Sequence, residues 1–135
     1  MKVCLDIQPA LGQRAGVGRY VRGLAEALPA AAGEDALCFG CFDFRRRGAA
    51  LQGGDVHAVR WLPGRLVQKA WKTLHWPPYD WFMPAADVYH FPNFIRPPLR
   101  RGRSVVTIHD VSFLRFPETT ERKNLAFLRS RIRAT

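Results

Sequence analysis

Acidic residues, cysteines and long apolar runs are scarce in this chain. Only 11 Asp and Glu stand against 21 Lys and Arg in its 135 residues. No apolar run approaches the roughly 20 residues that a membrane-spanning helix needs, and Asp6 interrupts the first apolar stretch, unlike a signal peptide. The three cysteines, an odd number, fit a reducing compartment better than a disulfide framework. We therefore expect a cytoplasmic location.

The net charge of +10 favours an anionic partner. Phosphate-bearing metabolites, acidic lipid head groups and nucleic acid are the candidates, and a coding bias toward arginine is an alternative explanation. No recognised nucleic-acid motif is present, which makes nucleic acid the least favoured partner. A hydrophobic fraction of 47% with 24% charged residues excludes a disordered chain, and the length fits one domain with a single core.

Strand-like and helix-like segments alternate along the chain. Apolar runs predict strands over residues 2–7, 36–44, 56–62, 87–91 and 104–108. Apolar residues at three- and four-residue spacing predict helices over about 16–28, over 66–74 and from about 119 onward. This order predicts a doubly wound α/β domain with a mostly parallel sheet.

The most informative stretch is Val-Val-Thr-Ile-His-Asp at residues 105–110. Four β-branched residues in a row predict a strand buried on both faces, and His109 and Asp110 then stand at its carboxyl end. Ligands bind at this end of open parallel sheets. His90 ends another predicted strand and is a candidate for the same crevice, with a histidine bonded to the backbone as the alternative.

Gly16 and Gly18 open the first predicted helix. Two glycines let backbone amides come close to a ligand, and a helix N-terminus favours an anion, so this segment is a candidate phosphate or sugar cradle. A nicotinamide cofactor is disfavoured, because the dinucleotide fingerprint requires a further glycine where Val21 stands. The structural alternative is that Gly16 supplies a positive φ and Gly18 allows close helix packing.

Two other clusters favour packing over chemistry. Cys38 and Cys41 form a CxxC inside a predicted strand, where residues three apart point to opposite faces, so we interpret them as core residues. Aromatic residues with Lys69 and Lys72 beside them are either core or a membrane-facing surface that could hold a lipid-linked substrate, and core packing is slightly favoured. They are Trp71, Trp76, Tyr79, Trp81 and Phe82.

The order of these motifs resembles the amino-terminal domain of family 4 glycosyltransferases, especially bacterial mannosyltransferase-like members that build cell-surface polysaccharides. The resemblance spans nearly the whole chain. It rests on Gly-Val-Gly-Arg-Tyr at 16–20, Tyr-His-Phe-Pro-Asn at 89–93, Val-Val-Thr-Ile-His-Asp at 105–110 and Val-Ser-Phe-Leu-Arg-Phe-Pro-Glu at 111–118.

The resemblance implies the amino-terminal half of a GT-B architecture, in which two Rossmann-like domains face each other. The first domain binds mainly the acceptor, and the second binds mainly the nucleotide sugar. The implied reaction is retaining transfer of a hexose, with mannose a candidate, from a nucleotide diphosphate sugar to a cell-surface glycan or lipid-linked acceptor. It requires no cofactor and no obligatory metal. Contact with an anionic membrane at the inner face of the plasma membrane is a further candidate property.

Residues 1–135 then correspond to an incomplete acceptor-binding domain, and the donor-binding domain is absent. A predicted helix that runs through 132–135 without a cap or a proline stop agrees with truncation. We therefore expect the full-length parent to be the enzyme and this chain alone to be inactive.

The resemblance also implies roles for single residues. Gly16 and Gly18 would approach the donor phosphates or sugar across the cleft, and Arg19 would assist acceptor or phosphate binding. His109 would hydrogen-bond a hydroxyl of the transferred sugar near the reacting carbon. Asp110 would orient that imidazole or the loop after it, or would only cap the following turn.

Tyr20, His90 and Asn93 lie in the same motifs and complete the candidate substrate-binding set. Two other functions stay open. One is a non-catalytic interaction domain that pairs with a separate donor domain. The other is a basic module that binds nucleic acid with a steep salt dependence.

Overall fold

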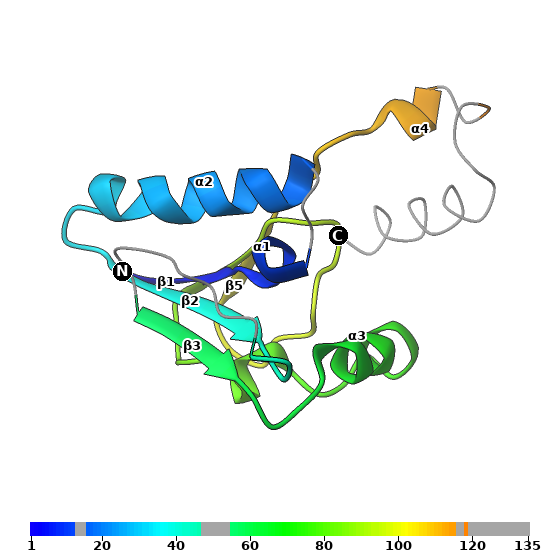
Figure 1. Cartoon of the computed structure of the whole chain (residues 1–135), viewed down its shortest axis with the longest axis horizontal. Coiled ribbons are helices and arrows are strands. Elements are labelled where there is room, and N and C mark those ends of the chain that lie inside the picture. Colours follow the sequence, from blue (N-terminus) through cyan, green and yellow to red (C-terminus); the bar gives the residue numbers. More distant parts are fainter. Residues whose placement is uncertain (13–15, 47–54, 116–117, 119–135) are drawn as a thin grey trace.

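A five-stranded parallel sheet forms the centre of the computed structural model, which describes residues 1–12, 16–46, 55–115 and 118 (Figure 1). The strand order is β3-β2-β1-β4-β5, and each neighbouring pair is parallel. The strands are β1 (Lys2–Asp6), β2 (Ala36–Phe42), β3 (Asp55–Val59), β4 (Val88–Phe91) and β5 (Arg103–Val106). This topology confirms the predicted α/β fold with a Rossmann-like sheet.

Helices lie on both sides of the sheet (Figure 1). The long helix α2 runs along one face, and α3 with a 3-10 helix η1 lies on the other side. Their bounds are α1 (Gln8–Gly12), α2 (Gly16–Ala31), α3 (Gly64–Thr73), η1 (Tyr79–Trp81) and α4 (Ser112–Arg115). The helix predicted from residue 119 onward lies outside the described residues.

The short helix α1 was not predicted, because five residues are too few to display a helical period. Local hydrogen bonding explains why it forms. The Gln8 N–H donates to Asp6 Oδ1 over 3.0 Å, which satisfies a backbone donor at the helix start. Pro9 follows in the first turn, where its missing N–H costs nothing. Helix α1 therefore begins directly after the carboxyl end of β1.

Two apolar clusters hold the layers together, because successive side chains of a strand point to opposite faces. The cluster under α2 joins the sheet to Val21 and Ala25, which stand one helical turn apart. Its other buried members are Leu5, Ile7, Phe39 and Cys41. The cluster on the α3 side is more aromatic and includes Phe42, Trp71, Tyr79, Tyr89 and Phe91.

The strand β5 differs from its prediction. It ends at Val106 rather than at residue 108, and it forms one edge of the sheet in the described part of the chain. Val105 is 49% exposed and Ile108 is 40% exposed, so the prediction of burial on both faces is wrong. The sequence pattern indicated the β-propensity of this segment correctly. Burial of a strand also requires a neighbouring element that covers it. Helix α2 does not cover β5, because its buried contacts are with β1 and β2.

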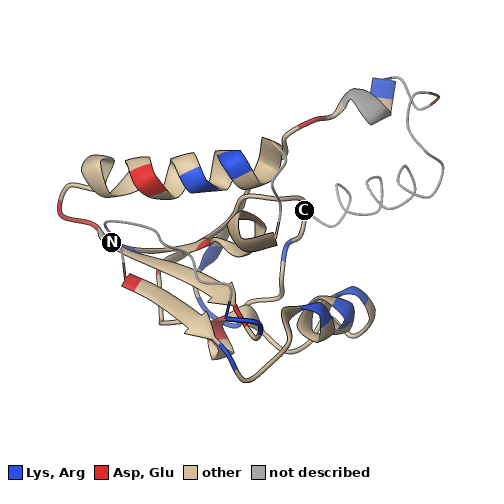
Figure 2. Cartoon of the chain, viewed as in Figure 1, with Lys and Arg blue, Asp and Glu red and all other residues tan. Residues whose placement is uncertain are grey.

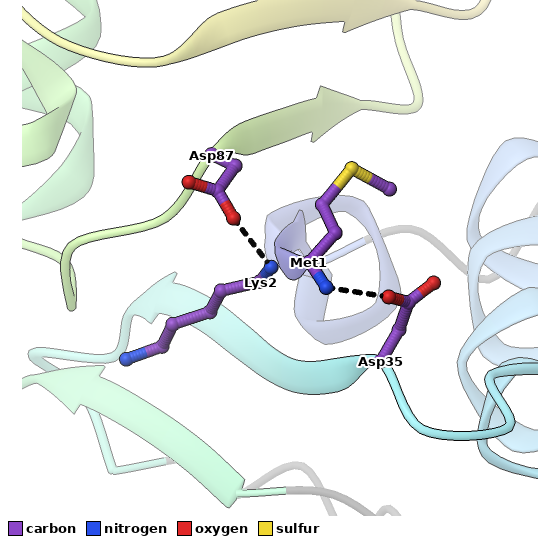
Figure 3. Close-up of polar contacts among 4 residues, drawn as sticks. All are labelled: Met1, Lys2, Asp35 and Asp87. Carbon is purple, nitrogen blue, oxygen red and sulfur yellow. Dashed lines mark hydrogen bonds and ion pairs between the residues drawn. The ribbon is translucent and has the colours of Figure 1, made fainter.

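Carboxylates bind backbone groups at the amino edge of the sheet (Figure 3). The amino group of Met1 donates to Asp35 Oδ1 over 2.6 Å, and this contact raises the pKa of the amine. The backbone of Lys2 pairs twice with Asp87: its N–H donates to Oδ2 over 2.7 Å, and its carbonyl accepts the Asp87 N–H over 2.9 Å. These two acidic residues hold the start of β1 between β2 and β4. The cavity described below lies at the other edge of the sheet, where the strands end.

Candidate functional site

A cavity of about 510 Å³ opens at the carboxyl ends of β1 and β2, between α1 and α3. Open parallel sheets bind ligands in this position. Polar and aromatic side chains from five segments line it. They include Asp6 and Gln8 where β1 ends and α1 begins, Asp43 after β2, Trp71 of α3, Tyr79 of η1 and Asn93 after β4.

Asp6 supplies a carboxyl group to this cavity. Its side chain keeps part of its surface accessible, yet protein atoms surround it closely, and this desolvation raises the pKa of the carboxyl to about 7. The hydrogen bond from the Gln8 N–H opposes the shift without cancelling it. Near neutral pH the group therefore exists in both forms, as a hydrogen-bond donor when protonated and an acceptor when ionised.

Two carboxamides in the cavity present their donor ends. Gln8 Oε1 accepts the Phe42 N–H over 2.7 Å, and Asn93 Oδ1 accepts the Phe94 N–H over 2.9 Å. Because a backbone N–H identifies the oxygen in each side chain, the remaining NH₂ groups are the donors left for a ligand. The cavity thus combines an acid with amide donors.

The mouth of the cavity is basic. Arg45 and Arg65 line it and are both exposed. Figure 2 shows further basic residues along α3, whose sequence contributes Lys69 and Lys72. The buried Asp43 is the second carboxylate of the lining. An anionic group is therefore favoured at the outer end of the cavity, beside the two guanidinium groups.

Tyr79 lines the cavity, and its hydroxyl lies close to Gly40 of β2. Among the described residues, this hydroxyl is buried without a hydrogen-bond partner. Burial raises the pKa of the phenol well above its usual value. A Cβ at Gly40 would lie 2.6 Å from Tyr79 Oη and 2.7 Å from Met83 Sδ, so any larger residue there would force these two side chains to shift.

We expect Gly40→Ala to lower the free energy of unfolding by about 1–3 kcal/mol, because overpacking a rigid core forces side chains out of position. Gly23→Ala is the matched control. A Cβ there meets nothing within 4 Å, so the exposed helical site should gain about 0.5–1 kcal/mol. Urea denaturation of both variants measures the difference, and equal stability of the two would contradict the packing argument.

The structure brings two predicted motifs together. The rings of Tyr20 and His109 meet edge to face with centroids 4.9 Å apart. His109 Nε2 lies 2.9 Å from the carbonyl oxygen of Pro92. A carbonyl only accepts, so Nε2 donates, and in the neutral imidazole Nδ1 is the remaining acceptor. Residues about 90 positions apart in the sequence thus place an oriented imidazole beside the start of α2.

His90 does not share a hydrogen bond with His109. Its Nε2 lies 2.8 Å from Thr107 Oγ1, and burial lowers the pKa of its imidazole. Asn93 is the one predicted site residue that lines the cavity. It follows Pro92, which accepts the His109 hydrogen bond, so a single short segment connects the cavity with the imidazole. The predicted roles of both histidines stay predictions.

The glycines of the 16–20 segment differ in their surroundings. Gly16 lacks a positive φ, and a Cβ there would meet none of the described residues within 4 Å. The structural explanation offered for Gly16 is therefore wrong. Gly18 is buried in α2, in line with close packing. Arg19 and Asp110 are both exposed.

Sequence reasoning missed Asp6 and Gln8 as site residues. The signal was available, because Asp6 ends an apolar segment of the sequence, as His109 follows the predicted strand over residues 104–108. The neighbouring α1 and the distant α3 were needed to show that a cavity forms there.

The CxxC residues belong to the core, as predicted. Cys38 and Cys41 are 3% and 1% exposed and contribute to opposite clusters. Burial raises the pKa of the Cys41 thiol to about 12, which suppresses its reactivity. Within the described ranges, no group of three His, Cys, Asp or Glu side chains is placed to hold a metal ion.

The aromatic cluster divides into two parts. Trp71 and Tyr79 are core residues, and Trp71 Nε1 donates to the Pro77 carbonyl over 2.7 Å. Trp76 and Trp81 are 54% and 51% exposed, and their rings meet with centroids 5.6 Å apart. Part of the cluster thus packs, and part forms a surface.

No helix in the described part of the chain is long and apolar enough to span a membrane. Comparisons with family models, with curated proteins and with solved structures give no match to this chain.

Proposed function

We propose that this chain is the acceptor-side, amino-terminal part of a retaining glycosyltransferase. The enzyme would transfer a hexose from a nucleotide diphosphate sugar to a cell-surface glycan or lipid-linked acceptor. The observation that supports this proposal best is the contact between Tyr20 and His109, which brings together two of the four motifs on which the family resemblance rests. Both lie near the carboxyl edge of the sheet, the ligand-binding edge of such folds.

The geometry suits the proposed chemistry. In the transfer, the bond from the sugar C1 to the nucleotide diphosphate breaks, a bond to an acceptor hydroxyl oxygen forms on the same face of the sugar, and the proton of that hydroxyl passes to the leaving diphosphate. His109 Nε2 is held by the Pro92 carbonyl, so Nδ1 is available to accept a hydrogen bond from a sugar hydroxyl. A positioned acceptor of this kind stabilises a transition state because it needs no reorganisation.

The start of α2 suits the donor phosphates. The first amides of a helix lack intrahelical acceptors, and the helix dipole favours negative charge there. No described neighbour excludes a side chain at Gly16, and its φ lies outside the left-handed region, so the described packing and backbone give no reason for glycine. Close approach of a ligand does supply one. The leaving diphosphate would therefore lie against this helix start.

Reading the coding sequence beyond the codon for Thr135 is the first test. We expect the reading frame to continue into a second α/β domain with a nucleotide-sugar site, and the full-length product to transfer hexose in the presence of a chelator. A stop codon at this point, with no separate donor domain encoded nearby, would overturn the proposal in favour of a binding domain.

We also propose that the protein contacts an anionic membrane surface. Three tryptophans are more than half exposed, namely Trp61 at 71%, Trp76 at 54% and Trp81 at 51%. Trp81 carries the Arg100 guanidinium 5.9 Å from its ring centre. Trp76 and Trp81 form one pair of exposed rings, and Trp61 contacts Phe82, the residue that follows Trp81 in the sequence. Tryptophan with basic residues is typical of a bilayer interface.

Vesicle sedimentation tests this contact. We expect binding to phosphatidylglycerol vesicles, little binding to phosphatidylcholine, and weakening as salt screens the charges. Trp76→Ala combined with Trp81→Ala should weaken binding about tenfold or more, because each ring removes about 1 kcal/mol of interfacial contact. Val105→Ala with Ile108→Ala is the control, since both side chains are exposed on and after β5. Equal losses in the two pairs would contradict a tryptophan-mediated contact.

A further inference from the structure

We propose that the cavity beside Asp6 binds an anionic polyol, with the hydroxyls inside and a phosphate or carboxylate group at the mouth. The inference goes beyond transferase activity, because it concerns a ligand of this chain itself. Of the residues that the family resemblance selects, only Asn93 belongs to this lining.

The cavity size limits the ligand. About 510 Å³ accommodates a molecule of monosaccharide size. It lies at the carboxyl edge, bounded by α1, the end of β2 and the start of α3. A ligand there contacts segments that are distant in sequence, so binding stabilises the assembled fold.

The inner lining matches hydroxyl groups. The Asp6 carboxyl accepts one hydrogen bond, from the Gln8 N–H, and retains further oxygen lone pairs. The carboxamides of Gln8 and Asn93 use their oxygens on backbone N–H groups, which leaves their NH₂ donors. Each sugar hydroxyl both donates and accepts, so an acid and two amide donors in one cavity pair well with a polyol.

Aromatic walls favour the same ligand. Phe42 and Trp71 line the cavity and contact each other edge to face, with centroids 5.9 Å apart. Tyr79 joins the same aromatic cluster at 6.2 Å from Phe42. The C–H faces of a sugar ring are apolar, whereas its rim is polar. The flat aromatic rings can contact the apolar faces of a sugar, and the fixed polar groups beside them can bind its hydroxyls.

The mouth supplies the charge preference. Arg45 and Arg65 are both exposed there, and neither belongs to a salt bridge within the described residues. Guanidinium groups bind phosphate and carboxylate through paired N–H donors. The carboxyls of Asp6 and Asp43 also line the cavity, so the anionic group of a ligand is placed at the arginines and away from these acids.

The test measures binding to the full chain by calorimetry and by amide chemical shifts. The probes are glucose 6-phosphate, glucose and inorganic phosphate. We expect glucose 6-phosphate to bind about tenfold or more tightly than either other probe, because only it satisfies both ends of the cavity. Equal affinity for inorganic phosphate would overturn the proposal by showing a charge effect alone.

Variants separate the two ends of the cavity. Arg45→Ala with Arg65→Ala should abolish the preference for glucose 6-phosphate over glucose, while Arg101→Ala with Arg103→Ala, at the opposite edge of the sheet, should preserve it. Asp6→Asn should weaken glucose 6-phosphate binding about tenfold through the lost carboxyl contact. A circular-dichroism melt of each variant monitors folding. Unchanged binding in both cavity variants would place the ligand elsewhere and refute the assignment.

A competition experiment with lipid vesicles shows whether the natural ligand is a lipid head group or a free metabolite. Displacement of glucose 6-phosphate by phosphatidylinositol vesicles, but not by phosphatidylserine vesicles, would support the pocket with a lipid head group as its ligand. No displacement by either would support it with a free metabolite. Sugar binding without any hexose transfer by the full-length product would leave this inference intact and remove only the transferase proposal.

Discussion

Asp6→Asn is expected to stabilise the chain by about 2–4 kcal/mol at pH 8 and to leave its stability at pH 4 nearly unchanged. The folded protein raises the pKa of this carboxyl from 3.8 to about 7 through desolvation. Between these values the unfolded chain has released a proton that the folded chain still holds. The free energy of unfolding is therefore highest below pH 4, where the carboxyl is protonated in both states. It decreases as the pH rises to 7, because the folded chain must keep a proton that the unfolded chain has lost.

The substitution removes this ionisation while keeping the hydrogen bond, because an amide oxygen still accepts the Gln8 N–H. Urea denaturation of both proteins at intervals from pH 4 to pH 8 measures the difference. Asp55→Asn is the matched control, since this exposed carboxylate begins β3 outside the cavity. A constant difference between Asp6→Asn and the parent chain across this range would contradict a desolvated carboxyl.

His109→Ala is expected to lower kcat of the full-length enzyme by about 10²–10³-fold, the usual cost of losing one positioned hydrogen-bonding group in a transition state. The imidazole is exposed, and its hydrogen bonding within the described structure is to the Pro92 carbonyl. Its removal should therefore shift the thermal midpoint by no more than a few degrees, corresponding to about 1 kcal/mol.

Steady-state transfer kinetics with a nucleotide diphosphate hexose provide the measurement. His57→Ala is the control, because this histidine is also exposed but lies on β3, away from Tyr20 and α2. We expect His57→Ala to retain full activity. A His109→Ala enzyme with normal kcat would assign this imidazole to loop structure and remove the main support for its role in transfer.

The gain in stability from Asp6→Asn and the loss of ligand binding share one cause. Enclosing a carboxyl in a cavity costs folding free energy, and such a cost is common where a group serves binding. Asp6 is therefore both a source of instability in the free chain and the inner polar contact of the proposed ligand.

Sequence pattern alone determined the class of the fold. Alternating strands and helices predicted a parallel α/β sheet, and three- and four-residue spacing located α2 and most of α3. The CxxC followed from the same reasoning, because strand geometry places Cys38 and Cys41 on opposite faces. These features depend on local periodicity, which the strands and the longer helices display directly in the sequence.

Tertiary structure alone decided which segments are covered and which charges are desolvated. The sequence of β5 has the character of an interior strand, yet the order of the sheet places it at an edge in the described structure. The sequence gives no sign that Asp6 differs from an ordinary carboxylate, whereas in the folded chain it lines a cavity and is desolvated. The contact of Tyr20 with His109 likewise joins distant segments. The burial and the pKa of a side chain depend on residues from elsewhere in the chain, so local periodicity cannot predict either property.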